Sequence, residues 1–112
     1  MEIKKPEIVE KPWGREIWIA VEDEYAGKIL EIKKGTQTSV HYHRKKKETM
    51  YVLKGILRMI GPDESFTLNV GESITVHPGE RHRLLAIEDL KILEVSTTEL
   101  DDVVRVEDDY GR

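Results

Sequence analysis

The stretch GTQTSVHYHRKKKETMYVLKG, residues 35–55, holds the pattern on which both the fold and the function depend. It places two histidines one residue apart, His41 and His43, before four consecutive cations at residues 44–47 and a carboxylate, Glu48. Residues i and i+2 of a strand point to the same face, so the two imidazoles share one face. Glu48 lies an odd number of residues further on and reaches that face only if the four cations form a turn. The pattern therefore predicts a turn at residues 44–47.

The composition restricts the class of protein. The chain has 112 residues, which predicts one domain over residues 1–112. Its net charge of −4 gives no reason to expect nucleic acid or an acidic membrane as a partner. It has no cysteine, so disulfides and thiolate zinc sites are excluded. No apolar stretch approaches a membrane span of about 20 residues, and the N-terminal stretch has no apolar signal core, so we expect a cytoplasmic protein.

Short apolar runs rich in Ile, Val, Leu and Tyr alternate with glycine and proline turns along the whole chain. This spacing is typical of an all-β sandwich or barrel. We expect one helical turn near Thr98–Val103, and the acidic tail at residues 101–112 is expected on the surface. The predicted strands are residues 15–22, 26–34, 49–60, 65–70, 73–78, 82–87 and 90–97.

One strand predicts an oligomer. In ETMYVL, residues 48–53, apolar side chains occur on both faces, and Tyr51 and Leu53 share the face opposite Glu48. A strand of a small monomeric barrel should have a polar outer face that is exposed to solvent. The outer face of this strand is apolar, so we expect a homodimer in which a second chain covers it. Trp13 and Trp18 are expected to be core or interface anchors, as large aromatic residues usually are.

A third histidine, His82, follows the Pro78–Gly79 turn and starts a predicted strand. Three imidazoles and a carboxylate form a ligand set for one divalent transition metal, Zn, Mn, Fe, Ni or Co, rather than for Ca or Mg. A pair of histidines at a strand end is also compatible with a structural or solvated role. The spacing of His41, His43 and Glu48 leaves both interpretations open.

Two glycine-anchored patterns resemble the motifs of the cupin superfamily. The first, Gly35-x5-His41-x-His43-x4-Glu48-x6-Gly55, reproduces the first cupin motif at every anchor. The resemblance implies a small β-barrel of the jelly-roll type, a cupin domain, in which these two histidines, Glu48 and His82 converge on the metal.

The second pattern, Gly71-x5-His77-Pro78-Gly79-x2-His82, resembles the second cupin motif, G-x5-P-x-G-x2-H-x3-N. It departs from that motif at His77, which replaces the first proline, and at Ala86, which replaces the final asparagine. Neither departure affects the implied ligand His82.

The two ends of the chain indicate which group of cupins the chain resembles. KPWG at residues 11–14 and VEDDYGR at residues 106–112 are similar to the flanks of one particular cupin domain. That domain ends the bifunctional mannose-1-phosphate guanylyltransferase/mannose-6-phosphate isomerases. Those domains usually have a shorter spacing than HYHRKKKE. With STT at residues 96–98, this octet looks more like cupins attached to other sugar-handling enzymes. The resemblance thus implies a sugar or sugar-phosphate ligand more firmly than it implies mannose.

The favoured function is a metal-dependent sugar-phosphate isomerase of the mannose-6-phosphate type. The metal would polarise the sugar oxygens, and Glu48, with Lys46 and His77 as further candidates, would serve proton transfer. Lys46 and Arg81 are the candidates for binding phosphate. The alternative for the cationic run is a solvated turn, and the alternative for His77 is a structural histidine. Two other functions remain open, a non-catalytic or regulatory sugar-binding cupin and a metal-dependent cupin dioxygenase.

Overall fold

The computed structural model describes residues 1–109, and within them the chain forms eleven β-strands and no helix. Consequently no helix in this part of the chain could cross a membrane. The strands are β1 (Glu7–Lys11), β2 (Gly14–Val21), β3 (Ala26–Ile32), β4 (Val40–Tyr42), β5 (Glu48–Lys54), β6 (Leu57–Ile60), β7 (Ser65–Leu68), β8 (Ser73–Val76), β9 (Arg83–Ala86), β10 (Leu90–Ser96) and β11 (Val104–Glu107). The predicted all-β class is confirmed.

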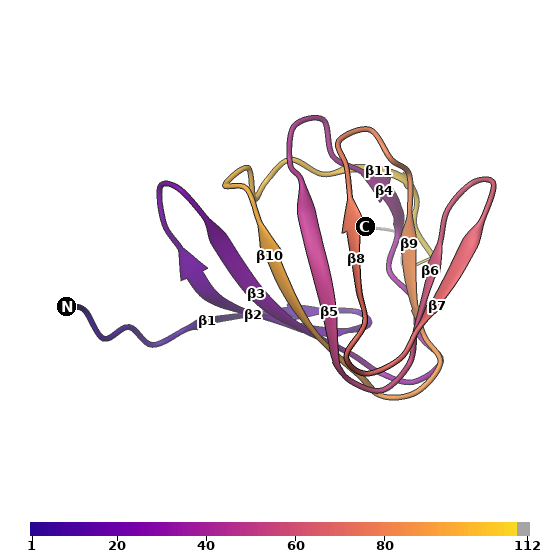
Figure 1. The fold of residues 1–112 in the computed structure, drawn as a ribbon, viewed down its shortest axis with the longest axis horizontal. Coiled ribbons are helices and arrows are strands. Elements are labelled where there is room, and N and C mark those ends of the chain that lie inside the picture. The colour runs from indigo at the N-terminus through magenta and orange to yellow at the C-terminus, as the bar shows by residue number, and fades with distance from the viewer. Residues whose placement is uncertain (110–112) are drawn as a thin grey trace.

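The strands form three antiparallel sheets that together make a jelly-roll type of barrel (Figure 1). A six-stranded sheet has the order β1-β2-β3-β10-β5-β8, and it faces a three-stranded sheet, β7-β6-β9, and a two-stranded sheet, β11-β4. Isolated bridges join the two smaller sheets, Gln37 with Leu85 and His41 with His82. The second bridge places two of the predicted metal ligands side by side.

All seven predicted strand regions contain strands, although residues 49–60 form two of them, β5 and β6. Gly55 separates the two, with φ at +87°, and a Cβ there would lie 2.3 Å from the carbonyl oxygen of Asp89. Only glycine is compatible with both constraints. The predicted ranges left out β1, β4 and β11, although His41 and His43 were expected to lie on a strand, and β11 lies in the tail that was predicted only as a surface segment. The end of that tail, residues 110–112, lies outside the described residues.

The predicted helical turn near Thr98–Val103 is wrong. The backbone there makes short-range hydrogen bonds, such as the 2.9 Å bond from the Leu100 N–H to the Thr98 carbonyl, without forming a helix. The reason is that Asp102 points its backbone carbonyl and its carboxylate toward residues 43–46, which lie far away in sequence. Tertiary contacts therefore decide the conformation of this segment.

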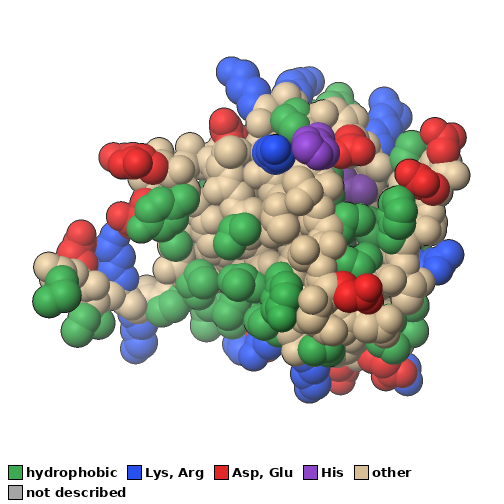
Figure 2. Space-filling model, viewed as in Figure 1, with side chains coloured by type: hydrophobic (Ala, Val, Ile, Leu, Met, Phe, Trp, Pro, Cys, Tyr) green, Lys and Arg blue, Asp and Glu red, His purple; other side chains and the backbone are tan. Residues whose placement is uncertain are grey.

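The core lies between the sheets and includes Trp13, which is 4% exposed, in agreement with its predicted role as an anchor. The outer face of the six-stranded sheet is different. Tyr51 and Leu53 are 42% and 40% exposed. Figure 2 shows apolar side chains gathered in the lower half of this view of the molecule. The two-faced character predicted for β5 is therefore present, and a single chain leaves its outer face in solvent.

Candidate metal centre

The four-residue turn predicted between the histidines and the carboxylate is present. Residues 44–47 bend between β4 and β5, and Glu48 is the first residue of β5, with only 2% of its surface exposed. His82 is fixed beside His41 by two backbone hydrogen bonds, of 3.0 Å from the His41 N–H and 2.9 Å from the His82 N–H. His41 and His43 thus lie at the end of β4, and His82 lies just before β9. Glu48 comes from the start of β5, in the six-stranded sheet opposite.

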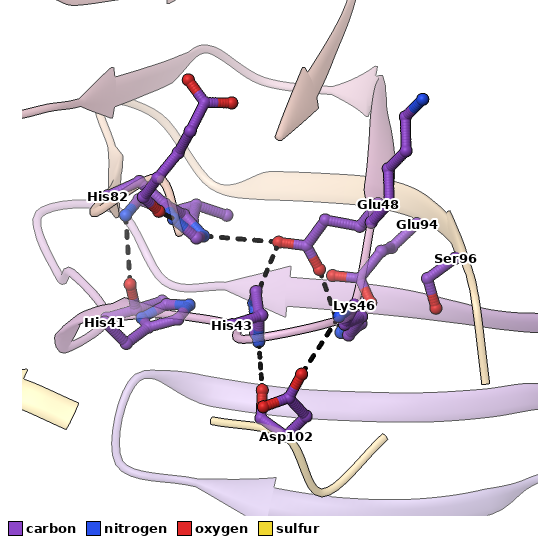
Figure 3. Close-up of polar contacts among 12 residues, drawn as sticks. His41, His43, Lys46, Glu48, His82, Glu94, Ser96 and Asp102 are labelled. Carbon is purple, nitrogen blue, oxygen red and sulfur yellow. Dashed lines mark hydrogen bonds and ion pairs between the residues drawn. The ribbon is translucent and has the colours of Figure 1, made fainter. Parts of the chain in front are cut away.

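These four side chains converge inside the barrel (Figure 3). One nitrogen from each of His41, His43 and His82 lies within 4.8 Å of the other two. The Oε1 atom of Glu48 lies 3.3 Å from Nε2 of His43 and 3.3 Å from Nε2 of His82. The cluster predicted from the sequence is therefore brought together.

The hydrogen bonds of the imidazoles identify their protonated nitrogens. Nδ1 of His41 donates to the Ser39 carbonyl at 2.9 Å, and Nδ1 of His82 donates to the Glu80 carbonyl at 2.9 Å. Nδ1 of His43 donates in the same way to the carbonyl of Asp102. A carbonyl oxygen only accepts, so each Nδ1 carries the hydrogen. Each neutral ring then presents a bare Nε2, as metal-binding histidines usually do.

The buried atoms of the cluster fit a cation. Nε2 of His43, Nε2 of His82 and Oε1 of Glu48 are buried and have no hydrogen-bond partner within residues 1–109. Three acceptors that face one another without a donor leave a large desolvation cost uncompensated. A proton or a metal ion at their centre removes that cost. Nitrogen and carboxylate donors together suit Zn, Mn, Fe, Ni or Co.

The protonation equilibria follow from burial and from Glu48. Burial, with the nearby charge of His82, lowers the pKa of His41 to about 3, so this ring is neutral at physiological pH. Burial also acts to lower the pKa of His43, but the neighbouring Glu48 carboxylate, 3.3 Å away, favours the protonated ring and leaves this pKa raised. Burial opposes ionisation of Glu48, yet the two imidazoles and Lys46 hold its pKa far below the usual range. His43 is therefore the ring on which a proton competes with a metal.

Lys46 does not lie in solvent with the other cations of its turn. It is 3% exposed, and its Nζ atom lies 2.9 Å from Oε2 of Glu48 and 3.2 Å from Oε2 of Glu94. The solvated-turn interpretation is therefore wrong for this residue, whereas Arg44, Lys45 and Lys47 are exposed. Burial acts to lower the pKa of Lys46, but the charges of the two carboxylates raise it.

Glu94 is the second carboxylate of this pair and was missed from the sequence. It is 4% exposed on the inner face of β10. Burial and the neighbouring charge of Glu48 raise its pKa to about 7. A signal was present, since Leu90 and Ile92 share its strand face, and a charge interrupts that apolar row. Lys28 interrupts the inner face of β3 in the same way.

Asp102 was also missed, and it organises the turn before Glu48. Its carboxylate accepts hydrogen bonds from the backbone N–H groups of Arg44, Lys45 and Lys46, at 3.1, 2.7 and 3.0 Å. These bonds lower the pKa of Asp102 to about 2. Its carbonyl accepts from His43, so one residue supports both the turn and a ligand ring. No local sequence pattern connects positions nearly sixty residues apart.

A cavity of about 300 Å³, which we call the metal cavity, opens from the centre toward solvent. Three of the ligands line it, together with Lys46 and Glu94. Its wall also holds the buried pair of Lys28 and Glu16, at 3.2 Å, with Lys28 lying 4.6 Å above the ring of Trp18. Apart from the ligands, Lys46 and Glu94, the aromatic and charged residues that line the cavity are Trp13, Trp18, Glu16, Lys28, Lys11, Asp101 and Arg105. Such a mixture can bind a small polar molecule.

The structure places His77 and Arg81 elsewhere. Both are exposed and line a second, wider cavity of about 750 Å³, which we call the side cavity. Arg81 lies over the ring of Tyr42, at 5.5 Å. His82, the fourth predicted ligand, lines the side cavity, whereas the other three line the metal cavity. Neither His77 nor Arg81 lies in the cavity that contains the other three ligands, and their predicted roles stay predictions.

Comparison with known proteins agrees with this geometry. Residues 28–96 match the cupin domain family (Cupin_2), so the chain belongs to the cupin family. An RmlC-like cupin from Shewanella frigidimarina has the same fold, with a TM-score of 0.78 and 20% identity over 88% of each chain. The nucleoside dehydratase Pac13 of Streptomyces superimposes with a TM-score of 0.82 and 15% identity, over 96% of this chain and 93% of that one. At such identities these likenesses show the fold alone.

A curated relative is closer in sequence. The chain is 33% identical over 109 residues to the mannose-1-phosphate guanylyltransferase ManC of Salmonella typhimurium. The match covers 93% of this chain but 23% of that protein. The chain therefore spans about a quarter of the length of the curated relatives it matches, and it is similar to their cupin region.

Proposed function

We propose that this protein is a metal-dependent sugar-phosphate isomerase of the mannose-6-phosphate isomerase type. The observation that carries the proposal is the sharing of one cavity by metal ligands and proton-carrying groups. His41, His43 and Glu48 line the metal cavity, and so do Lys46 and Glu94. Aldose–ketose isomerisation needs both kinds of group, because charge develops on two oxygens while a proton moves between adjacent carbons.

The size of the cavity and the relatives support the class of ligand. About 300 Å³ lies at the lower end of the range for small-molecule sites, which favours a monosaccharide over a nucleotide sugar. Trp13 and Trp18 offer apolar surface for the carbon face of a sugar ring. The similarity to the cupin region of mannose-1-phosphate guanylyltransferases supports a sugar phosphate as the ligand.

Each group of residues in the metal cavity would have a separate role in the isomerisation. A divalent metal on His41, His43, Glu48 and His82 would supply Lewis-acid polarisation of the carbonyl and hydroxyl oxygens. Glu94, with a pKa of about 7, can hold a proton or accept one near neutral pH, which suits a group that takes a proton from one carbon and returns it to the next. Lys46 holds one oxygen of Glu94 and thereby orients that carboxyl group.

The test is turnover by protein loaded separately with Zn, Mn, Fe, Ni or Co. Each form is incubated with mannose 6-phosphate and a panel of other phosphorylated aldoses, and ketose formation is followed by NMR. We expect conversion only in the presence of metal. Glu94→Gln should keep a full metal complement and lose about 100-fold or more in turnover, as expected for loss of an acid–base group. Glu88→Gln, an exposed carboxylate outside the metal cavity, is the matched control.

The same experiment separates the alternative functions. Absence of conversion by every metal form would contradict the proposal. Tight sugar binding without turnover would support a non-catalytic sugar-binding cupin. Metal-dependent oxygen consumption with the same sugars would support the dioxygenase interpretation.

A further inference from the structure

The two cavities that the predicted metal ligands line differ in charge. The side cavity is lined by four carboxylates, Asp63, Glu64, Glu72 and Glu80, against one permanent cation, Arg81. The metal cavity is lined by four cations, Lys11, Lys28, Lys46 and Arg105, and by four carboxylates, Glu16, Glu48, Glu94 and Asp101. A bound divalent metal would make the metal cavity positive. An anionic ligand is therefore attracted to the metal cavity and repelled from the side cavity.

Most cations of the metal cavity already neutralise carboxylates. Lys28 lies 3.2 Å from Glu16, and Lys46 lies between Glu48 and Glu94. The charge of Lys11 also acts on Glu16. Arg105 differs from these residues, because it is exposed and makes no ion pair with any other residue in the range 1–109. Its guanidinium is the cation that a ligand can engage without breaking an existing pair.

The register of β11 and β4 aims Arg105 at the metal centre. Arg105 is the direct antiparallel partner of His41. Directly opposed residues of an antiparallel pair have Cβ atoms about 5 Å apart on the same face of the sheet. Since His41 faces the metal cavity, Arg105 does so as well, and both residues line it. Its exposure places it at the mouth, where a phosphate could stay hydrated on one side.

From these observations we propose that Arg105 binds the anionic group of the ligand at the mouth of the metal cavity. The inference takes its class of ligand, a sugar phosphate, from the proposed function. A guanidinium offers two parallel N–H groups to a phosphate, which fixes the orientation of that group as well as its position. The sugar end of the ligand would then extend inward from the mouth toward the ligand side chains.

The test compares two arginine variants, each loaded with metal. Calorimetry gives the dissociation constants of a phosphorylated aldose and of the same aldose without phosphate. We expect Arg105→Gln to weaken the phosphorylated sugar roughly 10- to 100-fold and to change the unphosphorylated one less than about twofold. Arg81→Gln tests the competing phosphate candidate, which lines the side cavity, and should leave both unchanged. Metal content should be equal in all three proteins.

A second readout needs neither a sugar nor turnover. With Mn²⁺ bound, inorganic phosphate at Arg105 should show enhanced ³¹P relaxation that Arg105→Gln abolishes. Selective loss in Arg105→Gln without any isomerase activity would support the inference and remove only the proposed function. The inference is overturned if Arg81→Gln causes the selective loss, if Arg105→Gln weakens both sugars equally or neither, or if the wild-type protein binds neither the sugar phosphate nor inorganic phosphate.

Discussion

The Nζ atom of Lys46 lies 2.9 Å from Oε2 of Glu48, the oxygen that does not face the histidines. Glu48 therefore uses one oxygen toward His43 and His82 and the other toward a buried ammonium (Figure 3). The ion pair keeps the carboxylate ionised and fixes its rotation. Lys46 also contacts Glu94, so a single cation separates two buried carboxylates.

Removing this cation should destabilise the metal-free protein. Lys46→Met leaves Glu48 and Glu94 close together without compensation, and loss of one partner of a buried ion pair typically costs about 3–5 kcal/mol. Urea unfolding of the metal-free protein measures the change. The double variant Lys46→Met/Glu94→Gln should recover part of the loss. A loss below about 1 kcal/mol in the single variant would show that the two carboxylates do not depend on Lys46.

Asp102 should control metal affinity without touching the metal. Asp102→Ala removes the acceptor of three backbone N–H groups in the turn between His43 and Glu48. Loss of such outer support typically weakens metal binding about 10- to 100-fold. Titration with Zn²⁺ against a competing chelator measures the change. Asp101→Ala, at the exposed neighbouring position, should bind metal normally, and equal effects of both variants would argue against this role.

Metal binding should weaken on acidification. Because the pKa of His43 is raised above its ordinary 6.5, this ring takes up a proton more readily than a free histidine as the pH falls, and that proton must leave before a metal binds. Apparent affinity should therefore fall by up to about tenfold per pH unit below that raised pKa. A chelator titration across pH 5–8 tests this, and an affinity independent of pH would contradict it.

Metal affinity should rise with pH, but the free energy of unfolding of the metal-free protein should fall as the pH rises above the ordinary pKa of histidine. The raised pKa of His43 contributes stability that is fully present below 6.5 and is lost as pH rises through the folded value. The depressed pKa of Glu48 contributes stability that is present above 4.5 and is lost on acidification. Between these two values the lowered pKa of His41 and the raised pKa of Glu94 change the stability in opposite directions, so the four groups together predict greatest stability in this range. Urea midpoints against pH should show it, and the loss above pH 6.5 should flatten in His43→Gln.

We also propose a twofold dimer through the outer face of the six-stranded sheet. Apolar residues lie in direct register across five strands of this face, in the order Ile8, Ile17, Ile29, Leu93 and Tyr51. Light scattering should give twice the chain mass of 13.0 kDa at micromolar concentration. Tyr51→Glu should shift the mass to that of one chain. A wild-type mass of 13.0 kDa would contradict the dimer.

The sequence predicted the parts of this protein that depend on local patterns. Strand parity predicted the turn at residues 44–47, and the apolar runs between glycine and proline turns predicted most of the strands. The resemblance to the cupin motifs implied that His41, His43, Glu48 and His82 converge. The missed features depend on long-range contacts. Asp102 supports a turn 56 to 58 residues away. The side chain of Lys46 points inward because it forms an ion pair with Glu94 on β10. The register that brings Arg105 opposite His41 is equally invisible in a local pattern.

The most direct test of the account is the metal stoichiometry of the purified protein. The protein is loaded with a divalent transition metal and dialysed extensively, and the bound metal is measured by elemental analysis. Three bare imidazole nitrogens and one carboxylate oxygen predict one divalent transition metal per chain. His43→Ala should lose most of it while the circular dichroism of the β fold is unchanged, because the apolar core does not include that ring. A wild-type protein that retains no metal, or a His43→Ala variant that retains one equivalent, would contradict the account.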